Sequence, residues 1–231
     1  MRTTLSNEQL VIYDDFLPQA TIDALLDHVN RAPFSSVHET AVRKVWRLGD
    51  GMPLTGPTTY YRPAGKRYAR HERPRHPTGT AIDLFVDAVK EMLPAVSHFT
   101  GPNPASWDAM SVTPYVYTAG TSLGLHRDGR RYAGSYAYYL HGSWDFHWGG
   151  HLLILDPATS IAPPEYALPW VRDNDENRIV SEPGLATCVL AKPNRLVFIA
   201  PEAIHMITPV SASAGNRPRI SISGVFHRPE R

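Results

Sequence analysis

A histidine and a carboxylate stand two residues apart in the segment Gly124-Leu125-His126-Arg127-Asp128. Side chains at i and i+2 of a β-strand point to the same face, so an extended segment can present His126 and Asp128 to one metal ion. A third ligand can come from His205, which follows a short Pro-Glu turn between two apolar runs. Two histidines and one carboxylate, with open positions opposite, suit a non-haem Fe(II) that binds oxygen and an organic ligand together. The spacing therefore predicts a metal site at His126, Asp128 and His205.

A second chemical pattern lies further downstream, where an alternating strand begins at Arg219 and carries Ser221 on the same face. An arginine fork can bind a carboxylate through two hydrogen bonds, and a serine two residues along can add a third. Arg217 is a neighbouring candidate, but Arg217-Pro218 still belongs to the preceding turn. The pattern therefore predicts that Arg219 and Ser221 bind a carboxylate.

The order of these motifs, His-x-Asp, a distant His and then Arg-x-Ser, resembles that of the 2-oxoglutarate and Fe(II)-dependent oxygenases, over roughly residues 112–227. The segment 114–120 resembles the Tyr-x-x-Gly lead-in of the prolyl-hydroxylase-like branch. The segment 148–155 resembles its Gly-Gly-Glu-Leu strand, with His151 where glutamate is usual. The prolyl hydroxylases often have lysine where this chain has Arg219, so the chain is more similar to the small-molecule and bacterial members.

The resemblance implies a set of cofactors and a reaction. The cofactors are Fe(II), 2-oxoglutarate as cosubstrate and O2, and the reaction oxidises a C–H bond of a substrate. Halogenase relatives have Gly or Ala at the position of Asp128, so a carboxylate there favours hydroxylation. Carried over position by position, the metal ligands are His126, Asp128 and His205, and the cosubstrate-binding residues are Arg219, Ser221 and Tyr117.

Other functions fit parts of the pattern. His141, His147 and His151 could form a zinc site, but zinc would leave the Arg-x-Ser pair without a role. A protein or peptide hydroxylase would share the iron chemistry. A nucleic-acid demethylase of the AlkB-like type would have a second arginine where this chain has Val225. A non-catalytic cupin-type module would bind a metal or ligand without turnover.

With 231 residues, the chain fits a single domain that can bury a substantial core. Lys and Arg total 23 against 22 Asp and Glu, so the formal net charge of +1 does not favour nucleic acid or an anionic membrane. No apolar run approaches a membrane span, and the amino end lacks a signal-peptide core. The single Cys188 excludes an internal disulfide and suits a reducing compartment. We therefore expect a cytoplasmic protein with a small-molecule substrate and no nucleic-acid or membrane partner; the oligomeric state is left open.

The elements that must position these residues change in character at about residue 111, where short alternating runs broken by Gly, Pro and Asp begin. Eight such runs suit a double-sheet jelly roll. The predicted fold class is mainly β with flanking helices, a double-stranded β-helix (jelly roll, cupin-like) core supported by amino-terminal helices. The candidate strands span residues 112–117, 123–127, 135–141, 151–155, 186–190, 195–200, 205–210 and 219–227.

The first 110 residues are expected to support this core and to contribute to the substrate pocket. A short strand at 10–13 leads to a helix whose apolar stripe runs from Ile22 to Val29 and stops before Pro33. A second helix is predicted to start with Thr80 as its cap and to end before Pro94.

Two irregular segments, 31–76 and 157–183, are expected to close over the metal, although the second can equally be an inert surface loop. The basic run 66–76 can bind phosphate or form a solvated loop. Three tyrosines that alternate into the sheet can contact the cosubstrate or simply pack, and Tyr117 is the preferred contact because it lies in the lead-in motif; the other two are Tyr136 and Tyr138.

Overall fold

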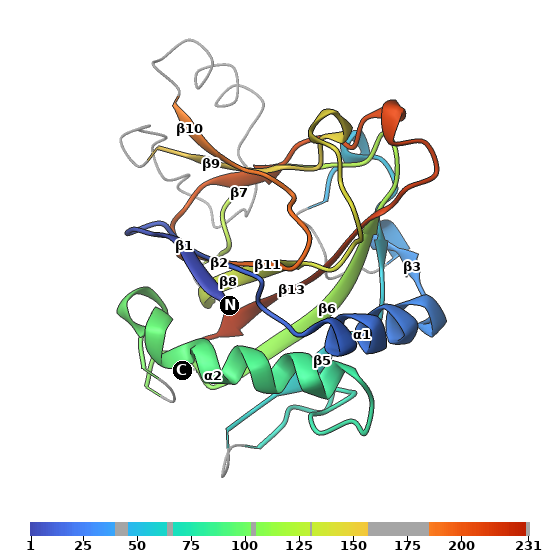
Figure 1. Ribbon diagram of the computed structural model, residues 1–231. Helices are drawn as coiled ribbons and strands as arrows, with labels where there is room; N and C mark the ends of the chain where they lie inside the picture. The colour runs from blue at the N-terminus through green and yellow to red at the C-terminus, as the bar shows by residue number, and fades with distance from the viewer. Residues whose placement is uncertain (40–45, 64–66, 103–104, 130, 157–184, 230–231) are drawn as a thin grey trace.

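Two antiparallel β-sheets face each other, and two helices cover the outer face of the larger sheet (Figure 1). The computed structural model describes residues 1–39, 46–63, 67–102, 105–129, 131–156 and 185–229. The larger sheet consists, in order, of β1 (Arg2–Ser6), β2 (Leu10–Asp14), β11 (Arg195–Ile199), β8 (Tyr132–Tyr139), β13 (Arg219–His227), β6 (Ala109–Tyr117), β4 (Leu54–Thr55) and β3 (Ser35–Ser36), with β5 (Thr59–Tyr61) also paired to β6. The smaller sheet consists, in order, of β10 (Ala186–Val189), β9 (Leu152–Leu155), β12 (His205–Ile207) and β7 (Leu123–His126).

This arrangement confirms the predicted fold class, a jelly-roll core with flanking helices. All eight predicted core strands are present, with boundaries that differ by a few residues. Every strand pair is antiparallel, which lets one face of each sheet line the interior between them. The inner faces of the two sheets therefore meet along the length of the barrel, and a site between them is enclosed on both sides.

The main hydrophobic core lies between the helices and the larger sheet. Helices α1 (Gln19–Arg31) and α2 (Ile82–Thr100) bury apolar stripes there, including Leu25 of α1 and Phe85 of α2, each fully buried. The Phe85 ring lies 5.3 Å from the Tyr138 ring of β8. Burying a large apolar side chain contributes about 1.5–3 kcal/mol, so this layer fixes the outer face of the larger sheet and leaves its inner face for the site.

Helix α2 differs from the prediction at both ends. Its N-cap is Ala81 without a side-chain cap, and the Asp83 carboxylate accepts the backbone N–H groups that precede the helix, so the predicted cap by Thr80 is wrong. The helix also continues through Pro94 to Thr100. A proline inside a helix removes one hydrogen bond, but continuation buries Val96 completely against the core, which offsets that loss.

The irregular segment 31–76 divides into two parts with different locations. The part with β3, β4 and the 3-10 helix Leu48–Asp50 lies beside the end of β6. The described residues of the second part, 59–63 and 67–76, pack against α2 instead: Lys90 Nζ lies 5.0 Å above the Tyr61 ring, and His76 Nε2 lies 3.3 Å from an Asp87 carboxylate oxygen. The expectation that the whole segment closes over the metal is therefore wrong for its second part.

The described part of the basic run, residues 67–76, forms a loop held by a buried carboxylate and by a guanidinium that bonds to the loop's own backbone. Glu72 is almost fully buried and accepts two hydrogen bonds of 2.8 Å from the Arg62 guanidinium, while Arg75 donates to the Glu72 carbonyl at 2.9 Å. Lys66, in this run, and the predicted insertion 157–183 lie outside the described residues. The only cysteine, Cys188 on β10, is an exposed free thiol. Neither helix in the described ranges has the length and apolar character needed to cross a membrane.

A buried carboxylate joins the amino-terminal strands to the core. The Asp14 side chain is 2% exposed and accepts hydrogen bonds from Arg195 (2.7 and 3.0 Å) and from Thr4 (2.8 Å), while Lys192 Nζ lies 3.2 Å away. Burial alone would raise the pKa of Asp14, but its hydrogen bonds to Arg195, Thr4 and Lys192 hold that pKa well below the usual range. The ionised carboxylate therefore stabilises the folded protein.

We expect Asp14→Asn to lower the free energy of unfolding at pH 7 by about 3 kcal/mol, because it leaves the buried Arg195 cation without its anion. The wild-type contribution is complete above the ordinary aspartate pKa of about 3.9 and is lost as the pH falls below it, so the two proteins should converge in acid. Urea unfolding at a series of pH values measures this. Asp15→Asn is the control, because Asp15 is 65% exposed; an equal loss there would contradict the assignment.

Candidate metal centre

Two histidines meet because β12 pairs with β7, which places His205 directly opposite His126. Their ring centroids are 4.2 Å apart, and both side chains are buried. The Nδ1 atom of His126 lies 2.9 Å from the Gly124 carbonyl oxygen, and that of His205 lies 3.0 Å from the Ala203 carbonyl oxygen. A ring that donates its Nδ1–H to a carbonyl presents the lone pair of Nε2, so both rings are oriented as metal ligands.

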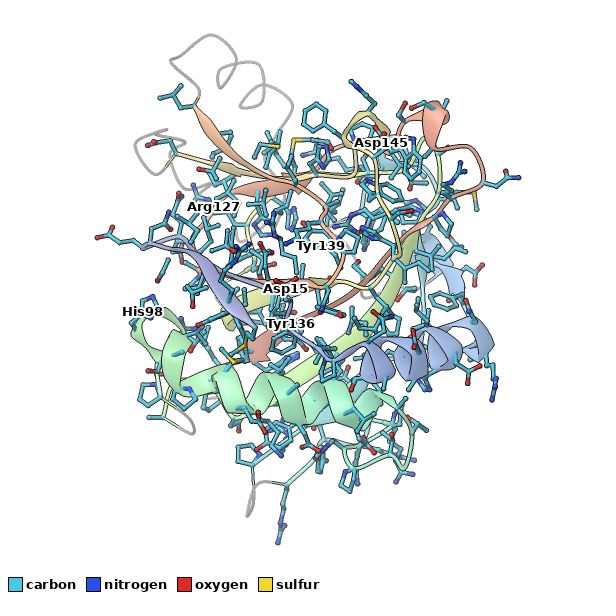
Figure 2. The ribbon with its side chains drawn as sticks, in the orientation of Figure 1. Asp15, His98, Arg127, Tyr136, Tyr139 and Asp145 are labelled. Carbon is cyan, nitrogen blue, oxygen red and sulfur yellow. The ribbon has the colours of Figure 1, made fainter. Side chains whose placement is uncertain are left out.

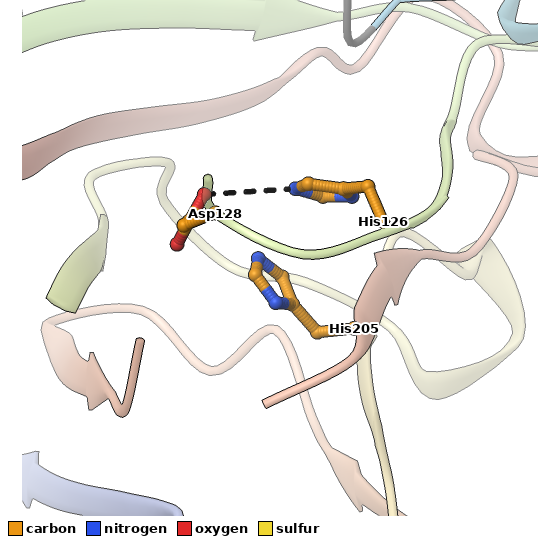
Figure 3. Close-up of side chains that lie close together, drawn as sticks. All are labelled: His126, Asp128 and His205. Carbon is orange, nitrogen blue, oxygen red and sulfur yellow. Dashed lines mark ion pairs between the residues drawn. The ribbon is translucent and has the colours of Figure 1, made fainter. Parts of the chain in front are cut away.

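Asp128 completes the group, although it does not lie in the strand as predicted. Strand β7 ends at His126, so Asp128 reaches the site from the following loop. Its Oδ1 atom lies 4.0 Å from His126 Nε2, and the ligand atoms of all three residues lie within 4.8 Å of one another (Figure 3). They are the only group of this kind that the described part of the chain contains.

The donor set and its environment fit a divalent metal. The Oδ2 atom of Asp128 is buried and has no hydrogen-bond partner within the described residues. An unsatisfied buried carboxylate oxygen is costly, and a cation at this point would satisfy it. Burial, and then the neighbouring His205, lower the pKa of His126 to about 4, so at pH 7 its imidazole is neutral, the form that binds metals.

A buried cation lies on β13 of the larger sheet. Arg219 is 1% exposed, donates through Nε to the Gly150 carbonyl at 2.7 Å, and donates through Nη1 to Ser221 Oγ at 3.2 Å. Its guanidinium carbon lies 4.9 Å from the Tyr117 ring and 4.8 Å from the Tyr139 ring. Among the residues described, no carboxylate pairs with it. Since an uncompensated buried charge is strongly unfavourable, this geometry is suited to an anionic ligand.

Tyr139 is a candidate functional residue that the sequence interpretation missed. Its hydroxyl is fully buried beside the Arg219 guanidinium, and among the described residues no acceptor for its proton lies within hydrogen-bond distance. Burial raises the pKa of Tyr139 and that of Tyr117, so both hydroxyls keep their protons and can donate. Tyr136 and Tyr138 instead pack on the α2 side of β8, where they bond to the Ser111 carbonyl and to Asn194, whereas Tyr139 faces the smaller sheet (Figure 2). Strand alternation alone could have indicated Tyr139, since it must face away from those two neighbours.

The glycine pair before β9 makes room for the Arg219 side chain. Gly150 has φ +65°, and a Cβ atom there would lie 2.7 Å from Arg219 Cδ, so a larger residue would displace the guanidinium. The next residue, His151, accepts the Ala191 N–H through Nδ1 at 3.2 Å and has Nε2 at 3.0 Å from the Phe146 carbonyl oxygen. His151 therefore holds neighbouring backbone in place.

The other histidines near the site do not form the alternative zinc centre. Both ring nitrogens of His141 face backbone carbonyl oxygens, of Ala191 at 2.9 Å and of Ile220 at 3.1 Å. His147 is exposed. These two and His151 do not converge on a common point within the described chain, so the histidine-rich neighbourhood serves as structural support.

Comparison with known proteins agrees with this geometry. Residues 111–227 match the sequence model of the 2OG-Fe(II) oxygenase superfamily. No curated protein sequence matches the chain. Among solved structures, a Pseudomonas putida prolyl-4-hydroxylase is similar at a TM-score of 0.57 and 19% identity, covering 95% of this chain and 93% of that one.

Two further solved structures share the fold. A 2OG-Fe(II) oxygenase family oxidoreductase from Burkholderia pseudomallei has a TM-score of 0.55 at 12% identity, with 96% of this chain and 86% of that chain covered. A Trichoplax adhaerens prolyl hydroxylase, solved with a hypoxia inducible factor peptide, has a TM-score of 0.53 at 16% identity, with 96% and 84% covered. At such identities the likeness extends to the fold alone.

We expect the purified protein to bind one Fe(II) under anaerobic conditions. His126→Ala, Asp128→Ala and His205→Ala should each weaken this binding by more than about 100-fold, because each removes a direct ligand. Calorimetric titration with Fe(II), or with Mn(II) as a redox-stable substitute, measures it. His147→Ala, an exposed histidine, is the control. Unchanged binding in the variants of both His126 and His205 would show that the metal lies elsewhere.

Proposed function

This chain belongs to the 2OG-Fe(II) oxygenase superfamily, and from that premise we propose that it hydroxylates a C–H bond of a small polar metabolite or biosynthetic intermediate. As a family member it is a 2-oxoglutarate-dependent dioxygenase that uses Fe(II), 2-oxoglutarate and O2. Bound together, these supply an oxidant strong enough to take a hydrogen atom from carbon. Residues 1–231 are proposed to form one oxygenase domain.

The observation that carries this proposal is the convergence of His126, Asp128 and His205 on one point inside the barrel. The two neutral imidazoles and the carboxylate would hold Fe(II) and leave its remaining positions open. The Asp128 oxygen without a partner is the atom that this assignment explains best. A carboxylate at this position also supports hydroxylation as the outcome.

Arg219, Ser221, Tyr117 and Tyr139 are proposed to hold the distal carboxylate of 2-oxoglutarate. Arg219 would supply the charge, and Ser221 fixes its guanidinium by accepting a hydrogen bond from Nη1. The buried Tyr139 hydroxyl would donate to the same carboxylate, which would give its proton an acceptor. Tyr117 packs over the guanidinium and restricts its rotamers. The four residues would thereby orient the cosubstrate toward the metal before the reaction begins.

The environment of the site also protects the reaction from water. His126 is 4% exposed, His205 is 6% exposed and Arg219 is 1% exposed, so the residues that would hold metal and cosubstrate are enclosed between the sheets. Exclusion of water strengthens the ionic contacts inside the site and keeps the oxidant from unproductive reactions.

Two observations support a small substrate. The net charge of +1 gives no extended basic field for nucleic acid. In the basic run, Arg75 donates to the backbone of its own loop and lies 4.8 Å above the Tyr68 ring, so this cation contributes to the loop's structure. Both observations favour a small polar molecule over an oligonucleotide.

Arg219→Ala should weaken 2-oxoglutarate binding by about 30-fold to several thousand-fold, because a buried carboxylate would lose its charged partner. Tyr139→Phe removes only a hydroxyl and should weaken binding about tenfold. Anaerobic titration of the Fe(II) protein, followed by the visible charge-transfer band of the chelate, measures both. Arg217→Ala is the matched control, since Arg217 is exposed and lies 5.0 Å above the Trp148 ring. A larger effect of Arg217 than of Arg219 would reverse the assignment.

The substrate class can be tested by succinate formation in the presence of candidate substrates. We expect stimulation by members of a panel of amino acids and other small polar metabolites, because their size suits an enclosed site. Peptides and oligonucleotides serve as the comparison panels. Stimulation by peptides alone would instead identify a protein hydroxylase, and stimulation by oligonucleotides alone a nucleic-acid oxygenase.

A further inference from the structure

The short segment 46–51 crosses from the larger sheet to the smaller one beside the metal centre. At its start, the Trp46 ring lies 5.8 Å from both the Tyr115 and Tyr117 rings of β6. At its end, the Asp50 carbonyl accepts the Ser122 N–H at 2.9 Å, and Asp50 Oδ1 accepts from Ser122 Oγ at 3.1 Å. Since Ser122 directly precedes β7, the segment connects the two strands at the edge of the barrel.

The backbone of this segment is held firmly. Asp50 is 4% exposed, and its Oδ2 atom accepts the Arg47 N–H at 2.8 Å. Gly51 has φ +74°, and a Cβ atom there would lie 2.9 Å from the Gly120 carbonyl oxygen, so only glycine allows this close approach. His38 Nε2 lies 2.8 Å from the Gly51 carbonyl oxygen. These contacts determine where the side chain of Arg47 begins.

The Arg47 side chain lies against Gly124 of β7, the strand that carries His126. A Cβ atom built on Gly124 would lie 3.7 Å from Arg47 Nε and 3.8 Å from its Cδ, and Gly124 is two residues from His126. Arg47 is half-buried, so its charge is only partly screened by water. Among the described residues, Arg219 is thus a cation buried in the barrel, and Arg47 is a second cation at its β6–β7 edge.

We propose that Arg47 is a specificity-determining residue that binds a carboxylate of the substrate. This inference rests on the proposed function. The charges of Fe(II), Asp128, the 2-oxoglutarate dianion and Arg219 would cancel one another, so the centre itself offers no attraction to an anionic substrate. Binding such a substrate would therefore need a second cation. Arg47 supplies that cation at a fixed position, and its planar fork matches a carboxylate. The substrate class is thereby narrowed to small molecules that carry a carboxylate.

A purely structural role for Arg47 makes a different prediction. Asp50 Oδ1 lies 3.4 Å from the same Gly124 Cβ position, so Arg47 also lies beside a buried carboxylate. If the guanidinium only balances the Asp50 charge, its removal lowers stability and does not alter the choice of ligand. If it receives the substrate, its removal abolishes discrimination between a carboxylate and an uncharged amide of the same shape.

The experiment compares wild type with Arg47→Met, which keeps the length of the side chain and removes its charge. The full-length Fe(II) protein with 2-oxoglutarate is titrated anaerobically with matched pairs: amino acids and hydroxy acids against their primary amides, and Asp-containing peptides against Asn-containing ones. Wild type should bind at least one carboxylate more than tenfold tighter than its amide. Arg47→Met should weaken carboxylate binding about 10- to 100-fold, leave the amide unchanged and leave the Kd of 2-oxoglutarate within about twofold. Arg217→Met is the matched control and should retain the preference.

Three outcomes would overturn the proposal. A persistent carboxylate preference in Arg47→Met would assign Arg47 to structure, and weakened 2-oxoglutarate binding would assign it to the cosubstrate. Wild-type protein that binds no carboxylate better than the matching amide would also contradict the proposal. The visible band of the Fe(II)–2-oxoglutarate chelate tests the metal and cosubstrate site independently, so failure of the proposed function would be recognised separately. Preference confined to the peptide pairs would contradict the small-molecule substrate and retain the role of Arg47. If Arg47→Met does not fold, Arg47→Lys keeps the charge without the fork and should show a reduced preference.

Discussion

The pairing of β7 with β12 is the constraint on which the candidate metal centre depends. Three potential ligands come from two distant parts of the chain, and only this pairing sets His126 opposite His205. The same strand pair ends beside the loop that carries Asp128, so one register determines all three positions. The facing wall of the barrel is the larger sheet, which a hydrophobic core fixes against helices α1 and α2. A shift of register by one residue would turn the histidines to the opposite face and remove the site.

The buried Arg219 has consequences for stability as well as for binding. Its guanidinium is held by the Gly150 carbonyl, Ser221 and two tyrosine rings, which together stabilise a cation that is nevertheless without an anion in the described structure. A fold that keeps such a charge buried is less stable than one with an apolar residue there. When an anion binds and pairs with the charge, that loss of folding free energy is recovered as binding free energy. The Asp14 cluster has the opposite design, since its carboxylate is already fully paired and contributes to folding at once.

Much of this architecture could be predicted from the sequence because it follows from local periodicity. Alternating strands, the apolar stripe of α1 and the residue types at the metal site are all properties of short segments. The missed features depend on tertiary pairing. Asp128 lies beyond the end of β7, because the pairing of β7 with β12 stops at His126 opposite His205. Helix α2 passes through Pro94 because the residues beyond it find a core to pack against. Arg47 is brought beside Gly124 by tertiary contacts such as that between Asp50 and Ser122, which no pattern in either segment indicates.

Residues on the inner faces of the barrel and residues at its edge are under different structural constraints, which explains why substrate specificity would be determined at the edge. Residues on the inner faces are constrained twice, by strand pairing and by their contacts with metal or cosubstrate, so few of them can vary without loss of the reaction. The backbone of segment 46–51 is fixed by Asp50, which bonds to Ser122 and to the Arg47 N–H, and the Trp46 ring packs against β6. The segment lies outside the strand pairings that form the barrel, so a side chain on it can change while the core remains intact. Arg47 occupies such a position, beside Gly124 of β7, and from there it is proposed to select the substrate.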